Sequence, residues 1–169
     1  MRRNYNLFDV LQNNAIGIIA IHSFILGYKK VVLNKHSGKE SAPSFSSLFY
    51  VLPIVYGESS LKSFKSSFEL YTALSKDRSI TLGLQERAQK MSAQTLDSIN
   101  LGFSKNIFIF NEENQTIDLS EKFNSISILN TMKISTPFLK EVRTASFRLG
   151  NIFAKKDDKM LQITMNIRF

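Results

Sequence analysis

One nearly unbroken apolar segment constrains the fold of this chain more than any other feature of the sequence. It runs from Ala15 to Leu26 (AIGIIAIHSFIL) and spans twelve residues. A membrane-spanning helix needs about 20 apolar residues, and no small-residue cleavage site follows the run, as one would after a signal peptide. With Asn13 or Asn14 as the N-cap, the segment predicts a central buried helix over residues 14–33.

Two further apolar segments predict helices that pack around the central one. Phe45–Tyr56 is strongly apolar and contains Pro53, which predicts a short helix that bends or ends at the proline. A longer amphipathic helix is expected from Ser59 or Ser60 to about Lys76. Its apolar stripe comprises Leu61, Phe64, Phe68 and Tyr71.

The last part of the chain predicts one long helix and a terminal strand. Pro137 suits the first turn of a helix, and residues 137–155 carry an apolar stripe that includes Val142 and Leu149. The tail Met160–Phe169 alternates loosely between apolar and polar residues, which favours a strand.

Residues 80–119 give the clearest supersecondary signal. Helices are expected over about 80–91 and 92–103, and a β-hairpin follows in which β-branched and aromatic runs flank a polar turn. Two helices followed by a hairpin is the local order of a winged helix. We therefore predict a winged-helix-like unit over residues 80–119.

Length and composition place these elements in one domain. The chain has 169 residues and no low-complexity tract, which predicts a single domain over residues 1–169. Its fold class is predicted as mainly α with a small β component (α+β), a helical domain containing the winged-helix-like unit and a C-terminal strand. The sequence has no cysteine, which excludes disulfides and thiolate metal sites and fits a reducing compartment. We expect a cytoplasmic protein that does not enter the membrane.

No catalytic or metal-binding constellation can be assembled from the residues. His22 lies in the apolar helix, where a hydrogen-bonded core or interface role is expected, and His36 lies in a polar loop. The carboxylates are scattered, and the sequence has neither a glycine-rich phosphate loop nor a nucleophile elbow. The sequence therefore predicts a protein that is not an enzyme, with no catalytic residue, no cofactor and no bound metal.

The charge balance leaves two interpretations open. The formal net charge is +8, and both ends of the chain are basic while the middle is near neutral. This pattern serves solubility, or it provides a surface that faces a polyanion such as nucleic acid. If the last helix packs beside the 60–76 helix, their cations form one basic patch; otherwise they are ordinary solvated helix faces. The basic patch comprises Lys62, Lys65, Lys140, Arg143, Arg148, Lys155 and Lys156.

The second helix of the winged-helix-like unit is poorly suited to reading DNA. The hairpin turn carries Glu112 and Glu113, which would repel phosphate, and the exposed positions predicted for 92–104 hold no Lys or Arg. These positions are Gln94, Thr95, Asp97, Ser98 and Asn100. Docking of a protein suits this unit better, and the apolar content of Phe45–Tyr56 exceeds what a small core needs. The candidate partner-docking residues are Phe45, Phe49, Tyr50, Leu101 and Phe147.

Four stretches, taken in order, carry a resemblance to a known family. The stretches are Asn13–Lys30 (NNAIGIIAIHSFILGYKK), Leu48–Pro53 (LFYVLP), Leu82–Met91 (LGLQERAQKM) and Ser146–Asp157 (SFRLGNIFAKKD). Together they resemble the middle component of bacterial three-component ABC-ATPase conflict systems, among which are the Lamassu-type antiphage systems. Each stretch is short and hydrophobic, so the order and spacing carry the resemblance. The tail Met165–Phe169 departs from the family's Leu-Gly-rich ending, which leaves the role of the terminus open.

The resemblance implies a non-catalytic accessory subunit of an antiphage defence complex. Such a subunit binds an SMC-like or Rad50-like ABC ATPase and helps to hold an effector, often a nuclease, inactive until foreign DNA is sensed. Contact with DNA would then be indirect or limited to non-specific contacts with the phosphate backbone. A free-standing winged-helix DNA-binding transcription regulator is the alternative hypothesis.

Overall fold

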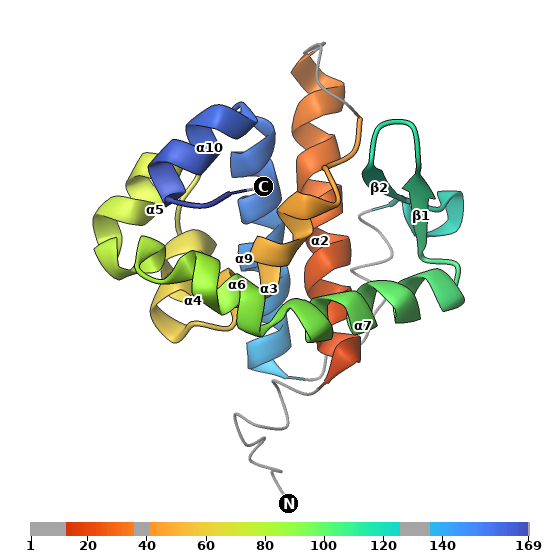
Figure 1. Ribbon diagram of the computed structural model, residues 1–169, viewed down its shortest axis with the longest axis horizontal. Helices are drawn as coiled ribbons and strands as arrows, with labels where there is room; N and C mark the ends of the chain where they lie inside the picture. Colours follow the sequence, from red (N-terminus) through yellow and green to blue (C-terminus); the bar gives the residue numbers. More distant parts are fainter. Residues whose placement is uncertain (1–12, 36–40, 126–135, 169) are drawn as a thin grey trace, which may run out of the picture.

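The computed structural model describes residues 13–35, 41–125 and 136–168, and within these ranges the protein is mainly helical with one small sheet (Figure 1). The predicted fold class is thereby confirmed. The α-helices are α2 (Asn14–Lys35), α3 (Val51–Val55), α4 (Glu58–Lys65), α5 (Leu70–Lys76), α6 (Leu84–Lys90), α7 (Ser92–Ser104), α9 (Pro137–Ala154) and α10 (Asp158–Met165). Short 3-10 helices are η1 (Ser46–Tyr50), η2 (Arg78–Thr81) and η3 (Glu121–Phe123), and the strands are β1 (Phe108–Asn111) and β2 (Thr116–Leu119).

The pair α2–α9 forms the centre of the molecule, and the two helices run in the same direction through it (Figure 1). A Cβ atom on Gly27 would overlap the backbone carbonyl of Phe147, and one on Gly150 would overlap the carbonyl of Phe24. The two backbones therefore touch where these glycines face them, and no side chain fits between. The central buried helix predicted over residues 14–33 is confirmed.

The amphipathic helix predicted over residues 137–155 is confirmed as α9. Thr136 caps its N-terminus by accepting a hydrogen bond from the Leu139 N–H, and Pro137 occupies the first turn, where a missing N–H does no harm. The predicted apolar stripe, including Val142 and Leu149, is buried against α2 and α4.

At 22 residues, α2 is longer than the apolar run suggested. This helix, which lies within the described residues, is long and apolar enough to cross a membrane. The shortness of the twelve-residue apolar run therefore does not exclude a membrane span. Most of α2 is nevertheless buried within the protein, packed on α9, α7, α3 and β2. Its apolar character is accounted for by this packing on several sides.

The helix–helix–hairpin order predicted for residues 80–119 is present. Gly83 adopts a left-handed conformation (φ 60°) between η2 and α6, so the first predicted helix is divided there. Helix α7 matches the predicted second helix closely. β1 and β2 pair antiparallel in the register Phe108↔Leu119, and Ser44 extends the sheet by one bridge to Thr116. The order of the elements is that of a winged helix. That the unit resembles a winged helix in three dimensions stays a prediction.

The single helix predicted from Ser59 or Ser60 to Lys76 is wrong, because the chain breaks between Lys65 and Leu70. The Ser66 hydroxyl donates to the carbonyl of Lys62 at 3.0 Å, and serine side chains that bond to the backbone in this way compete with helix continuation. Helix α5 then starts with a different face toward the core.

This break exposes half of the predicted apolar stripe. Phe68 is 66% exposed and Tyr71 is 83% exposed, whereas Leu70 and Ala73 take the buried positions. The first half of the stripe, in α4, is buried as predicted.

The predicted C-terminal strand is also wrong, because residues 158–165 form helix α10. Asp157 caps this helix by accepting a hydrogen bond from the Met160 N–H at 2.8 Å. The alternating pattern places apolar residues two apart, so every second one also satisfies the four-residue spacing of a helix. Leu161 and Met165 are accordingly buried, and Ile163 is 68% exposed.

Two smaller predictions concern Pro53 and His22. The helix predicted to bend or end at Pro53 continues to Val55, since the proline lies in the first turn of α3, where its missing N–H is tolerated. His22 is a hydrogen-bonded core residue, as predicted: its Nε2–H donates to the carbonyl of Phe123 at 2.8 Å. Burial lowers the pKa of His22 below its ordinary value, which favours the neutral imidazole. His36 lies outside the described residues.

Candidate partner-binding pocket

A pocket of about 210 Å³ lies between the C-terminal halves of α2 and α9. Phe68, from the connection between α4 and α5, forms one wall. The lining residues are Lys30, Val31, Asn34, Phe68, Arg148, Asn151 and Lys155.

Helix geometry accounts for this convergence. Lys30 and Asn34 are four residues apart on α2, while Arg148, Asn151 and Lys155 are spaced by three and four at the end of α9. Residues at such spacings share one face of a helix. Because the glycines hold the two helices close together at their crossing, the faces that diverge beyond it enclose a small cavity.

Three cations contribute to the pocket, and each has a different environment. Lys155 Nζ lies 2.5 Å from a carboxylate oxygen of Glu69 and also donates to the carbonyl of Phe68 at 2.9 Å. The guanidinium of Arg148 stacks on the Phe68 ring, 4.0 Å from its centroid. Lys30 Nζ lies 5.7 Å from the centroid of the Phe147 ring. Within these contacts one carboxylate faces three cations, so the pocket is net positive.

Two buried polar atoms on α9 belong to residues that line the pocket. Arg148 Nη1 and Asn151 Oδ1 have no hydrogen-bond partner in the part of the chain that the structure describes. A buried donor or acceptor without a partner destabilises a fold by about 1–3 kcal/mol. Both atoms are shielded from solvent, so they add to the cost of this arrangement and not to the surface that a ligand reaches.

The pocket combines an arginine with an exposed aromatic residue. Phe68 is 66% exposed, and its ring stacks on the Arg148 guanidinium. Arginine and aromatic residues are enriched among the residues that dominate binding at protein interfaces.

Comparison with known families identifies the class of protein. The family model described as ABC-three component (ABC-3C) system Middle Component 3 (MC3) matches residues 1–169. The chain belongs to this family. It is thus an accessory component of an ABC three-component system, as the resemblance of the four sequence stretches predicted. Searches of curated proteins and of solved structures return no match.

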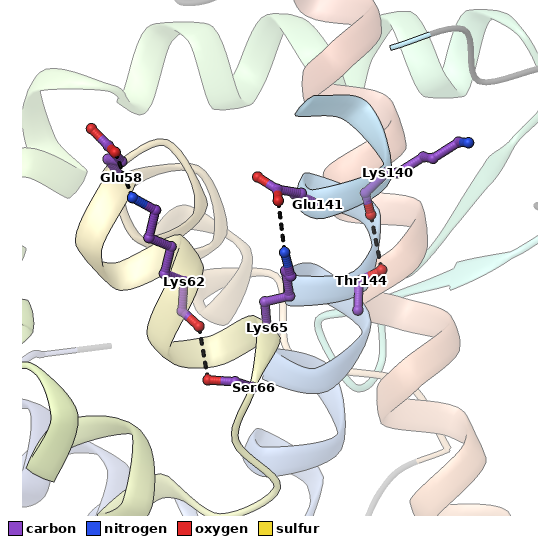
Figure 2. A network of polar contacts seen from close by, with 7 residues as sticks. All are labelled: Glu58, Lys62, Lys65, Ser66, Lys140, Glu141 and Thr144. Atoms are coloured by element: carbon purple, nitrogen blue, oxygen red, sulfur yellow. Dashed lines mark hydrogen bonds and ion pairs between the residues drawn. The ribbon is translucent and has the colours of Figure 1, made fainter. Parts of the chain in front are cut away.

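In this middle component the predicted basic patch is divided among different environments. Helices α4 and α9 do lie side by side, as the patch required, but the cations between them are paired with carboxylates. Figure 2 shows Lys65 of α4 reaching Glu141 of α9 at 2.6 Å, and Lys62 paired with Glu58 at 2.6 Å. The carboxyl of Glu58 and the ammonium of Lys62 shift each other's pKa in opposite directions, lowered for Glu58 and raised for Lys62.

The other members of the basic patch are distributed along α9 and its end. Lys140 is exposed and points away from the Lys65–Glu141 pair (Figure 2). Arg143 and Lys156 are half-buried, and Arg148 and Lys155 line the pocket. A role of these residues in contacting nucleic acid stays a prediction.

The candidate partner-docking residues lie in four places. Phe45 and Phe49 are half-buried and pack edge-to-face with ring centroids 5.3 Å apart, and Phe110 of the hairpin lies 6.0 Å from Phe45. Leu101 and Phe147 are half-buried on α7 and α9. Tyr50, in contrast, belongs to the core: it is 3% exposed, and its hydroxyl lies 2.7 Å from Gln85 Oε1 and 2.5 Å from the Arg168 carbonyl.

Helix α7 of the middle component presents no cation on its exposed face. The exposed residues within α7, all of which the structure describes, are Ala93, Leu96, Asp97, Asn100 and Ser104. Its opposite face packs on α2, where the side chain of Ser98 occupies the space beside Gly17. The predicted absence of Lys and Arg from the exposed face is confirmed, and the helix lacks the cations with which a recognition helix contacts phosphates. The prediction that Thr95 and Ser98 are exposed is wrong, because both lie on the face that packs into the core.

Sequence reasoning missed most of the pocket. Lys30, Val31 and Asn34 lie at the end of a helix recognised mainly for its apolar run. Phe68 was placed in the core stripe of a helix that breaks before reaching it. The two adjacent serines at 66 and 67 were the signal that could have located the break.

Proposed function

We propose that this chain binds the large ABC ATPase of its system, of the SMC or Rad50 type, and helps to hold an effector inactive until foreign DNA is sensed. The observation that carries the proposal is the match of the middle-component family model over residues 1–169. A middle component of a three-component system acts together with other subunits, and the net-positive pocket with its exposed aromatic rim offers a surface for one of them. In this proposal the chain itself performs no catalysis and works in the cytoplasm, in an antiphage system of the Lamassu kind with a nuclease-type effector.

Co-expression with the products of the two neighbouring genes tests the proposal. The expected result is a stable complex that contains the large ATPase, identified by its mass after purification. The middle component should also melt at a higher temperature with the ATPase than alone, because a partner that binds only the folded state stabilises it. A chain that purifies as a lone monomer or homodimer, and whose melting temperature ignores the ATPase, would contradict the proposal.

We further propose that any direct contact of this subunit with DNA is made to the phosphate backbone without sequence preference. The support is the net charge of +8 together with exposed Lys140 on α9, set against an α7 that lacks cations. Lys140→Glu should then weaken binding to duplexes of unrelated sequence equally, and binding should fall with added salt. Strong preference for one duplex sequence would instead favour the transcription regulator.

A further inference from the structure

We infer that the pocket between α2 and α9 receives an acidic side chain of a protein partner, with the partner's backbone lying across Phe68. This inference rests on the proposed function, because it names the chemistry by which a subunit of the same system is recognised. The charge of the pocket, its volume and its exposed aromatic wall carry it together.

The charge of the pocket selects the occupant. Lys30, Arg148 and Lys155 converge on one cavity, and Glu69 offsets one of these three charges. The Lys155–Glu69 pair shows within the chain itself that a carboxylate fits at the rim. A second carboxylate, brought by a partner, complements the remaining charge, since carboxylates pair with guanidinium and ammonium groups through short charge-assisted hydrogen bonds.

The volume of the pocket favours a single side chain over a free metabolite. Pockets that hold drug-sized small molecules measure about 300–1,000 Å³. The α2–α9 pocket, at about 210 Å³, is smaller than this range. A carboxylate side chain carried by a macromolecule needs no more room than that.

The aromatic wall favours a protein over the phosphate backbone of nucleic acid. Phe68, which is 66% exposed, lies among the cations as an apolar wall of the pocket. A phosphodiester backbone offers no apolar group to cover this ring, whereas a peptide segment with an acidic residue offers both a carboxylate and apolar side chains.

The rim of the pocket supplies the apolar part of such an interface. Phe68 is 66% exposed although its ring already stacks on Arg148. A partner segment lying over Phe68 would cover this ring and would exclude water from the charged contact beneath. Excluding water around a central contact is what makes such contacts strong.

Charge-altering variants of the full chain, titrated against the purified ATPase and the purified effector of its own system, test the inference. Arg148→Gln keeps a polar side chain and removes the charge, and Lys30→Glu reverses a charge at the exposed side of the pocket. Each should weaken binding of one partner at least about tenfold. Lys62→Glu on α4 is the matched control, because Lys62 is an exposed cation outside the pocket lining; its effect should stay within about twofold. Unchanged circular dichroism and melting temperature would establish that the variants fold.

The outcomes separate this inference from the proposed function. If the wild-type chain binds neither subunit, both are wrong. If the wild-type chain binds and the pocket variants bind equally tightly, only the pocket inference is wrong. It is also wrong if the variants keep partner binding and lose affinity for duplex DNA, because the pocket would then be a phosphate site. Reversing single carboxylates of the bound partner to lysine should restore binding to Lys30→Glu at one position, and that position identifies the inserted side chain.

Discussion

The helices of the central pair α2–α9 and those of the outer segment α4–α5 differ in what surrounds them. In the centre, Phe24 of α2 and Phe153 of α9 pack edge-to-face with ring centroids 5.4 Å apart, and glycines let the two backbones touch. In the outer segment, the Ser66 hydroxyl bonds to the Lys62 carbonyl and the helix stops at Lys65. Both regions carry an apolar pattern in the sequence, and that pattern alone does not distinguish them.

The difference shows what close packing contributes to helix continuity. Most helical stability in proteins comes from packing of an apolar face rather than from intrinsic propensity. The central helices are covered on several sides, so local competition from side chains has no effect on them. The outer segment consists of two short helices at the edge of the molecule (Figure 1), and there the chain breaks at Ser66, whose hydroxyl bonds to the Lys62 carbonyl. The interruption leaves Phe68 on the surface, where it forms a wall of the pocket.

Substitution of Gly150 by alanine, in the central pair, should cause the largest loss of unfolding free energy. The added methyl group would overlap the carbonyl of Phe24, so α2 and α9 must separate, and we expect a loss of about 3 kcal/mol or more in unfolding free energy. Urea denaturation measures it. Gly83→Ala is the control: a Cβ there meets only Glu86 Oε2 at 4.0 Å, an ordinary contact, and the left-handed backbone (φ 60°) opposes the side chain by about 1–2 kcal/mol. If the two variants unfold at the same urea concentration, the close contact of α2 and α9 does not stabilise the centre.

The pH dependence of stability should reveal the buried histidine of α2. Burial lowers the pKa of His22 in the folded state, so the unfolded chain binds a proton more readily. In the unfolded chain the pKa of this histidine is about 6.5. The unfolding free energy should therefore fall as the pH drops below that value, and it should level off below the pKa that His22 has in the folded protein. Because one proton is involved, the effect should be smaller than that of Gly150→Ala.

The variant His22→Gln provides the test of this pH effect, since it keeps an N–H donor near the Phe123 carbonyl and cannot titrate. Its unfolding free energy, measured by denaturant titration at several pH values, should change less between pH 7 and pH 5 than that of the wild type. An equally steep decline in both proteins would assign the pH dependence to other groups.

The ion pair that joins the outer segment to the centre should contribute little. Lys65 and Glu141 lie 2.6 Å apart, but their side chains are 41% and 38% exposed. Pairs this exposed are worth about 0.2–1 kcal/mol. A double-mutant cycle of Lys65→Ala and Glu141→Ala should give a coupling energy in that range. A coupling above about 2 kcal/mol would mean that this pair, rather than apolar packing, holds α4 on α9.

The sequence predicted those elements whose local signals agree with their packing. The apolar character of residues 14–33, the Thr136-Pro137 start of α9 and the β-branched residues of the hairpin each have a physical cause that acts locally, and each element formed. Family membership was also accessible, because two of the four matching stretches lie in α2 and α9, and the other two lie around α3 and α6.

The elements that could not be predicted are those for which one pattern permits two structures. Leu161, Ile163 and Met165 alternate like a strand, yet Leu161 and Met165 also lie one helical turn apart, and the Asp157 cap decides for the helix. The pocket was inaccessible for a different reason. Lys30 and Arg148 are 118 positions apart, and they converge because glycines set the crossing of α2 and α9. A single sequence does not encode that crossing in any local pattern.

The smallest effect should come from Ser67, within the break itself. Ser67 is 1% exposed, and its hydroxyl has no hydrogen-bond partner among the described residues. Ser67→Ala removes an unsatisfied buried group, so the unfolding free energy should stay within about 0.5 kcal/mol of wild type or rise slightly. Ser66→Ala is the matched control, because it removes a hydroxyl that donates to the Lys62 carbonyl and accepts from Lys76 Nζ at 2.8 Å, and it should destabilise more. If Ser67→Ala is instead the more damaging of the two, the break is held by the buried hydroxyl of Ser67 rather than by the backbone contact of Ser66.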